Sequence, residues 1–205
     1  MLSRAHVGVG VAAALFMLHP TTTMGVVATT AGAAVGSLIC DIDIRSSDRA
    51  RDAFRGRMAV LVLVSALLAY DYTHGGGVCA YLVTHLGLPM LSGVAGFVAT
   101  CVVGALMPHR TFAHSLLALA LWSASLQLVC PALVAPFAIG TASHLLLDLT
   151  NHTGVQLFWP LHVRASLGLW RSSGHVNDLL ALVGTVTAAL LFVVLLYVST
   201  ASSLL

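Results

Sequence analysis

Seven apolar runs, separated by short polar segments, fill most of this chain of 205 residues. They cover approximately residues 7–19, 24–40, 58–72, 90–107, 112–129, 131–149 and 179–198. A helix of roughly 20 apolar residues crosses the hydrocarbon core of a bilayer, and a shorter helix suffices where its neighbours thin the membrane. We therefore expect an all-α, polytopic membrane bundle of about seven spans, forming a single domain over residues 1–205. The glycine-rich stretch 74–88 is too short to span, and we expect a loop with an interfacial segment there.

The composition excludes the other broad classes of protein. Charged residues make up 8% of the chain and apolar residues 59%, whereas a soluble domain carries about 25% charged residues. Disordered chains combine low hydrophobicity with high net charge, and a net charge of +2 is too small for nucleic-acid binding. The four cysteines lack the spacing of a thiolate zinc site, so we expect small buried side chains.

All nine basic residues are arginines, and their positions predict an orientation. With the N-terminus inside and each apolar run crossing once, every arginine falls on the inner side and the outer turns contain none. Membrane proteins place their arginines and lysines preferentially on the cytoplasmic side. The sequence therefore predicts an N-in, C-out topology, in which the short first run is the weakest span.

Histidine and aspartate gather at the ends of these runs, on the arginine side. Four segments bring them there: RAH at 4–6, LICDID at 38–43, PHRTFAHS at 108–115 and SHLLLDLTNH at 143–152. Ionisable groups within membrane helices are costly and usually face a functional cavity. Because four separate segments supply these groups to one layer, we expect them to form one site.

The residue types in this layer are those of a metal site. His144 and Asp148 are four residues apart and share one helix face, so they can chelate one ion. Asp41 and Asp43 point the same way if the backbone is extended there. Imidazole and carboxylate suit Zn²⁺, Mn²⁺ or Fe²⁺. The candidate ligands are His6, Asp41, Asp43, His109, His114, His144 and Asp148.

These candidates exceed what one tetrahedral ion needs, which favours a binuclear site, although one ion is also compatible with the sequence. For each residue alone, a helix–helix hydrogen bond or a helix cap is the competing interpretation.

The four segments, taken in order, resemble the YdjM-like family of small membrane proteins. RAHVGVG, SLICDID, HRTFAHS and SHLLLDLTNHTGVQLFWPL match its pattern over roughly residues 4–165. The sequence departs from that pattern at Cys40, where the family has proline, and at Phe112-Ala113, where a Gly-x pair is usual. Neither departure removes a candidate ligand.

The resemblance implies a membrane-bound, metal-dependent hydrolase, because members of this family are described as predicted enzymes of that kind. The family is also distantly similar to zinc phospholipase C and P1 nuclease, all-helical enzymes that cleave phosphoesters with a zinc cluster. This implies that the seven candidate residues are metal ligands and that zinc is the expected ion, with one or two bound.

We therefore expect cleavage of a phosphoester of a lipid or lipid-linked substrate at the inner leaflet by metal-activated water. We place Asp43, His114 and Arg110 at the catalytic centre, since the planar guanidinium of arginine suits a phosphate group. Trp159 and Trp170, in an apolar segment that contains a proline, form either a surface anchor or a rim for lipid.

Three alternatives stay open: a non-catalytic membrane protein with a structural metal, a metal-dependent lipid amide hydrolase and, less favoured, a transporter. A transporter needs ligands at the membrane midplane or at both faces. The expected partners are membrane lipids and a lipid-linked phosphate, with no nucleic acid, and a homo-oligomer is compatible with the sequence. The expected location is the plasma (inner) membrane of a prokaryote, as a multi-pass integral protein.

Overall fold

The computed structural model describes residues 3–44, 47–73, 75–170 and 175–202, in which the chain is all-α. The described residues form eight α-helices and three short 3₁₀ helices. They are α1 (Ser3–Leu18), α2 (Thr23–Ile39), η1 (Cys40–Asp43), α3 (Ser47–Thr73), α4 (Gly77–Thr84), α5 (Leu88–Leu106), η2 (Phe112–His114), α6 (Leu116–Val129), η3 (Pro131–Leu133), α7 (Val134–Leu149) and α8 (His175–Ser202), where η marks a short 3₁₀ helix. Each predicted apolar run is helical, and in the described residues 75–87 the short helix α4 lies between two connecting segments.

Four stretches of the described residues are long and apolar enough to cross a membrane. They are Thr23–Asp43, Leu88–Leu106, Pro131–Leu149 and His175–Ala201. Helices α1 and α6 are apolar but have only 16 and 14 residues. The first part of α3 carries several arginines and aspartates. Helix length and composition therefore support a multi-pass protein with four candidate spans, and they do not support the finer prediction of seven.

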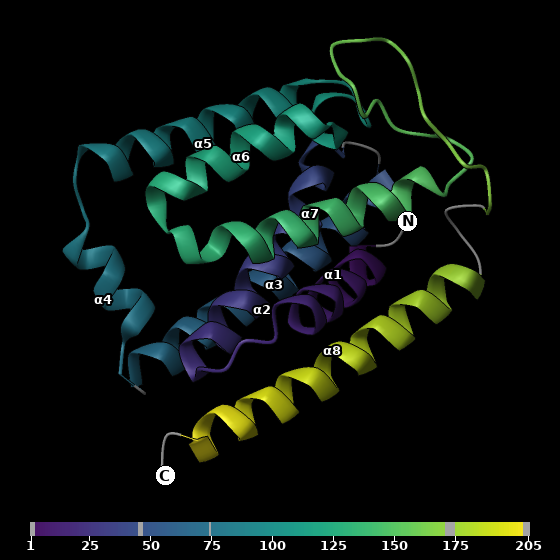
Figure 1. Cartoon of the computed structure of the whole chain (residues 1–205). Coiled ribbons are helices and arrows are strands. Elements are labelled where there is room, and N and C mark those ends of the chain that lie inside the picture. Colours follow the sequence, from purple (N-terminus) through teal and green to yellow (C-terminus); the bar gives the residue numbers. More distant parts are fainter. Residues whose placement is uncertain (1–2, 45–46, 74, 171–174, 203–205) are drawn as a thin grey trace.

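Helix α1 lies in the middle of the bundle, where it packs against α2, α7 and α8 (Figure 1). Glycines allow these close approaches. A Cβ on Gly140 of α7 would lie 2.3 Å from the Ala33 carbonyl oxygen of α2, and one on Gly36 of α2 would lie 2.2 Å from the Phe137 carbonyl oxygen of α7. Only a residue without a side chain fits there, so α2 and α7 pack backbone to backbone.

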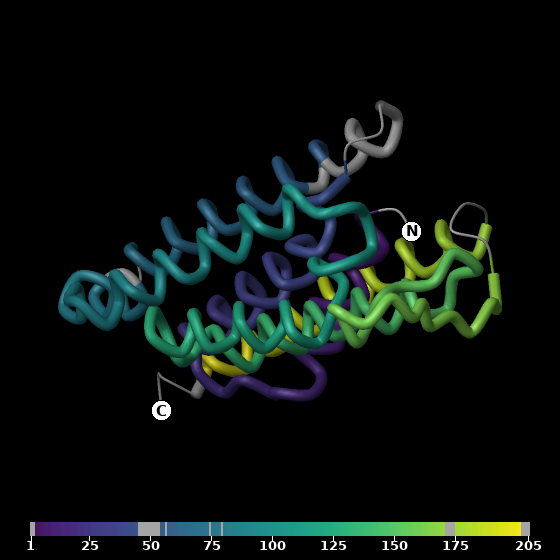
Figure 2. The backbone as a smooth tube through the Cα atoms, turned by 90° about the horizontal axis from the view of Figure 1, so that it is seen from above, coloured from purple at the N-terminus to yellow at the C-terminus, as the bar shows by residue number. Residues whose placement is uncertain are grey.

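The start of α1 and the ends of α2, α5 and α7 lie at one end of the bundle, together with the segment 150–170 (Figures 1 and 2). The end of α8 lies at the opposite end of the bundle. Segment 150–170 forms no helix and is joined to the α5–α6 connection by backbone hydrogen bonds from Gln156 N to Arg110 O (3.2 Å) and from Leu116 N to Leu157 O (2.9 Å). The fold thus gathers the histidine- and aspartate-containing segments at one end.

A buried aspartate links two helices at the opposite end of the bundle. Asp71 is 5% exposed, and its carboxylate accepts the backbone N–H of Val78 at 3.1 Å. It therefore joins the end of α3 to α4. The described residues exclude two arginines on which the predicted topology rests, Arg45 and Arg171, and they also exclude His74.

Candidate metal centre

Four segments bring seven histidine and aspartate side chains together at this end of the bundle. They are His6 on α1, Asp41 and Asp43 on η1, His109 and His114 in the α5–α6 connection, and His144 and Asp148 on the last turns of α7. Six of the seven are at most 4% exposed, whereas the His109 side chain is 31% exposed. The predicted convergence of these residues on one site is confirmed.

Asp148 lies at the centre of the cluster. Its Oδ1 is 3.7 Å from His6 Nε2, and its Oδ2 is 3.5 Å from His114 Nε2 and 3.8 Å from His144 Nε2. The guanidinium of Arg110 approaches the same Oδ2 at 3.2 Å. The predicted pairing of His144 with Asp148 on one face of α7 is therefore present, and Asp148 also connects α1 and the α5–α6 connection.

His144 presents one ring nitrogen to the cluster. Its Nδ1 lies 2.7 Å from the backbone carbonyl of Ser37 on α2. A carbonyl oxygen can only accept, so Nδ1 carries the proton and donates it. In the neutral ring Nε2 then has a lone pair, which faces Asp41 Oδ1 at 3.6 Å and has no hydrogen-bond partner. A histidine held in this way by a carbonyl is the usual arrangement of a metal ligand.

His6 and His114 are also buried with unpartnered ring nitrogens. His6 stacks on His144 with ring centroids 3.7 Å apart, and its Nδ1 has no hydrogen-bond partner. Neither ring nitrogen of His114 has one, although Nδ1 lies 3.5 Å from Asp43 Oδ2. Buried polar atoms without partners are rare because each costs free energy. Several such atoms in one cluster are suitable donors for a cation.

Asp43 organises the turn that follows α5. His109 Nδ1 lies 2.6 Å from Asp43 Oδ1, and the backbone N–H of Arg110 donates to Oδ2 at 3.0 Å. Arg110 has a φ of +65°, a left-handed conformation that costs energy for a residue other than glycine and that is often found at functional sites. The hydrogen bond from its N–H to Asp43 stabilises this conformation and directs Arg110 towards Asp148.

The possible ligand atoms form three groups, in each of which all the atoms lie within 4.8 Å of one another. The groups are His6, His144 and Asp148; Asp41, His114 and His144; and Asp43, His109 and His114. Adjacent groups share His144 or His114. Within the described residues these groups contain no cysteine, and Cys40 packs in an apolar cluster instead. The donor set is therefore nitrogen and oxygen, and it is large enough for more than one ion.

The charges of the cluster also favour a cation. Among the described residues, three carboxylates meet the buried guanidinium of Arg110. With the imidazoles neutral, the carboxylates outnumber that cation, and burying uncompensated charge is expensive. A divalent cation would supply both the missing charge and the missing partners of the ring nitrogens. The residues present therefore fit a metal ion.

The backbone at Asp41 and Asp43 is not extended, so the condition for the two side chains to point the same way is not met. Residues 40–43 form a 3₁₀ helix that continues α2. Asp41 consequently lies beside His144, and Asp43 lies beside His109 and His114. Each of the two carboxylates also belongs to a group of possible ligand atoms that includes His114.

The sequence reasoning missed three polar residues that hold the cluster in place. Asn151 Nδ2 donates to Asp148 Oδ1 at 2.9 Å, and Ser3 Oγ donates to Asp41 Oδ2 at 3.3 Å. The third is Ser37, through its backbone carbonyl. Asn151 falls three residues after Asp148, a spacing that places both on one side of a helix end and that could have identified it. Nothing in the local sequence marks Ser37, because its partner is 107 residues away.

The relationship of this chain to known proteins is that of a family member. The family described as "YdjM inner membrane protein" matches residues 1–204. The chain belongs to this family. Membership of an inner membrane protein family, together with four helices able to cross a bilayer, confirms the predicted multi-pass inner-membrane location.

One curated relative of this family member is the "Uncharacterized protein YvsG" of Bacillus subtilis (strain 168). The two are 33% identical over 98 residues, which make up 47% of this chain and 61% of YvsG. The match thus spans about three-fifths of the relative's length. No solved structure matches this chain.

We predict that His144→Ala and Asp148→Ala each remove divalent metal from the purified protein. Each of the two side chains approaches several others in the cluster. Metal affinity should therefore fall by more than the factor of about 10–100 that removal of an outer-shell partner costs. The measurement is elemental analysis of protein purified without chelator, with exposed His162 changed to alanine as the matched control. Metal content equal to that of His162→Ala in both variants would remove this pair from the site.

Proposed function

We propose that this family member is a membrane-embedded, metal-dependent hydrolase that cleaves a phosphoester of a lipid or lipid-linked substrate. The observation that carries the proposal is the buried group of imidazole nitrogens without partners, facing three carboxylates. Purely structural histidines would have their ring nitrogens hydrogen-bonded. The nitrogen and oxygen donors favour zinc, with manganese or iron as other candidates.

The seven clustered residues would hold one or two ions. Because His114 and His144 are each shared between neighbouring groups of donors, two adjacent ions are the arrangement that uses the whole set. Bound there, such ions would polarise a phosphoryl oxygen and lower the pKa of a water molecule. The surrounding side chains then have to bind the substrate, orient it and move protons.

Arg110 is the residue best placed to bind an anionic oxygen. Its Nη2 pairs with Asp148, but its Nε and Nη1 are buried without hydrogen-bond partners. Nη2 shares one edge of the guanidinium with Nε and the other edge with Nη1, so the edge that does not face Asp148 can donate two N–H groups to two oxygens of a phosphate group. The side chain is 5% exposed and lies within the cluster, so a phosphate that it binds would lie beside the ions.

Asp43 and His114 complete the proposed catalytic centre. Asp43 holds Arg110 by the backbone and His109 by the ring, so it fixes the turn that supplies both. His114 lies 3.5 Å from both Asp43 and Asp148, with its two ring nitrogens unpartnered. An imidazole between two carboxylates can ligate an ion or accept a proton from the reacting group.

The surroundings of the cluster favour a lipid substrate. His109, the one candidate ligand with substantial exposure, marks the open side of the site. Beside it, segment 150–170 is joined to the Arg110 turn, and its Trp159 packs edge-on against Phe112 with centroids 5.2 Å apart. The same segment exposes apolar side chains, which are Phe158, Leu161, Val163, Leu167 and Leu169. Such a surface would keep acyl chains in the membrane while a headgroup reaches the site.

A structural metal is the second candidate, and one observation favours it. Six of the seven candidate ligands are almost fully buried, as in a closed site whose ion is held only for stability. The two functions differ in access: an enzyme has to admit substrate past His109 and Arg110, whereas a structural site does not.

The substrate's side of the membrane depends on the orientation, and we propose N-in, C-out with seven spans. The start of α1 and the end of α8 at opposite ends of the bundle support an odd number of crossings (Figure 1). Reporter fusions after residue 88 and at the C-terminus should both read as outside, because both follow an odd number of crossings. A C-terminus that reads as cytoplasmic would contradict this orientation.

We predict that Arg110→Lys lowers lipid turnover about 10- to 100-fold, the loss expected for one charged hydrogen bond. Metal content should stay unchanged, because lysine keeps the positive charge but not the bidentate geometry. The measurement is phosphate release from phospholipids and prenyl phosphates by detergent-purified protein, with and without chelator. The matched control is Arg164→Lys, which changes an exposed arginine.

The same assay separates the two functions. If no phospholipid or prenyl phosphate is consumed while the metal remains bound and resists the chelator, the hydrolase proposal is wrong and the structural metal replaces it.

A further inference from the structure

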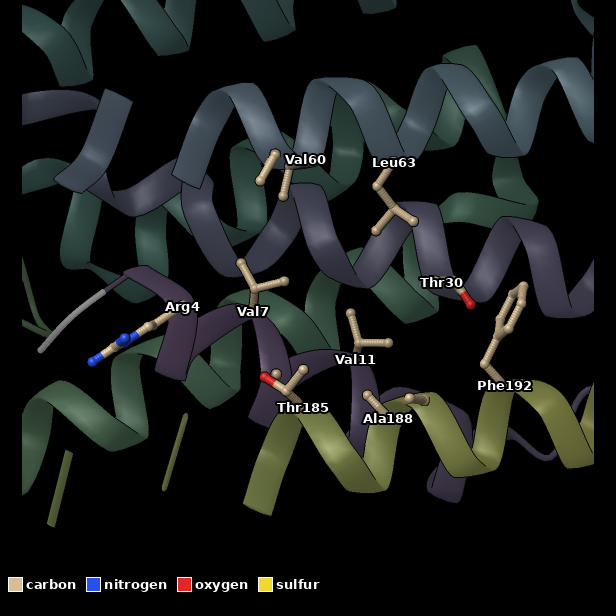
Figure 3. A pocket seen from close by; sticks show the side chains of 12 residues that line it. Arg4, Val7, Val11, Thr30, Val60, Leu63, Thr185, Ala188 and Phe192 are labelled. Carbon is tan, nitrogen blue, oxygen red and sulfur yellow. The ribbon is translucent and has the colours of Figure 1, made fainter. Parts of the chain in front are cut away.

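An apolar groove lies between α1, α2, α3 and α8, with a volume of about 390 Å³ (Figure 3). Its size is within the roughly 300–1,000 Å³ of ligand pockets. Most of its lining is aliphatic or aromatic. The side chains that line it include Val7, Val11, Val60, Leu63, Ala188 and Phe192.

This groove is separate from the metal centre. Its α1 lining consists of Arg4, Val7, Gly8 and Val11, which recur at intervals of three and four residues and so occupy one helix face. His6 points from another face of α1 and stacks on His144 of α7. Helix α1 therefore separates the groove from the metal centre, so the groove is not part of that site.

The groove has one basic end and an apolar remainder. Arg4 lies at one end in Figure 3, and the side chains from Val7 to Phe192 continue away from it. On α3, Arg55 and Arg57 precede the lining residues Ala59, Val60 and Leu63 by one or two turns, so they lie towards the same end. Arg4 is paired with Asp178 at the start of α8, and both side chains are more than half exposed. The basic end of the groove is therefore exposed at the surface of the protein.

Helix α8, which forms one wall of the groove, is largely exposed. Within the span of α8 only 11% of the residues are buried, and many of its large apolar side chains are exposed, among them Leu182, Val186 and Leu190. In a membrane, an apolar hollow that opens between such helices is surrounded by lipid. The distance along the helix axis from Arg4 to Val11 is about 10 Å at 1.5 Å per residue, so the groove is elongated parallel to the acyl chains.

We infer that this groove binds one acyl chain of an anionic glycerophospholipid, whose phosphate lies beside Arg4. The apolar lining accommodates the chain, and the arginines at one end attract the charged headgroup, as basic residues at a membrane surface do. Asp178 partly offsets the charge of Arg4 and thereby weakens that preference. The lipid is a bound component of the protein and is independent of the proposed hydrolase activity.

Native mass spectrometry of the whole protein, reconstituted with phosphatidylglycerol or with phosphatidylcholine of the same acyl chains, tests this inference. The wild type should retain one phosphatidylglycerol per chain and less phosphatidylcholine. Arg4→Gln should reduce the preference about five-fold, the change expected for one basic residue near the headgroups. Asp178→Asn should increase it by a similar factor, which a merely destabilised bundle would not do.

A second pair of variants tests the location. Ala189→Phe places a ring in the groove from an exposed lining position and should abolish retention, whereas Ala99→Phe makes the same change on exposed α5 and should not. Equal lipid retention by these two variants would overturn the inference. So would equal retention of the two lipids by the wild type, or a lipid-free dimer that Ala189→Phe dissociates.

Discussion

The burial of carboxylates and imidazoles at one end of an apolar bundle is the constraint on which the rest of this structure depends. Asp43, His114, His144 and Asp148 are each at most 2% exposed. Charged groups removed from water need partners of opposite charge, and the desolvation cost is several kcal/mol for each ion. Among the described residues, the buried guanidinium of Arg110 is one such partner. A cation at this position would therefore stabilise the local fold as well as serve the proposed chemistry.

The helices are arranged so that these side chains can meet. Glycines at the contacts let α2 approach α7 and let α1 approach α8, where a Cβ on Gly8 would lie 2.7 Å from the Thr185 nitrogen. The close approach of α2 to α7 brings the Ser37 carbonyl within reach of His144, and this hydrogen bond sets the orientation of the ring. Backbone packing in the apolar part of the bundle thus determines the geometry of its polar end.

The sequence predicted the membership of the cluster better than its internal geometry. Helix periodicity placed His144 and Asp148 on one face, and the layer of arginines placed the four segments at one end. The role of the Ser37 carbonyl could not be predicted, because its partner His144 is 107 residues away. The 3₁₀ turn at Asp41 and Asp43 and the burial of Asp71 are local features that the residue types did not indicate. Helix length and composition alone support four of the seven predicted spans, since α1 and α6 have only 16 and 14 residues.

X-ray absorption spectroscopy of the metal in purified protein tests the central claim most directly, because it identifies the donor atoms. Zinc held by the cluster should show only nitrogen and oxygen neighbours, at about 2.0–2.2 Å, with the outer-shell signature of imidazole rings. A pair of ions would add a metal–metal distance of about 3.5–4 Å. Sulfur neighbours at about 2.3 Å, or protein that retains no metal, would contradict the account.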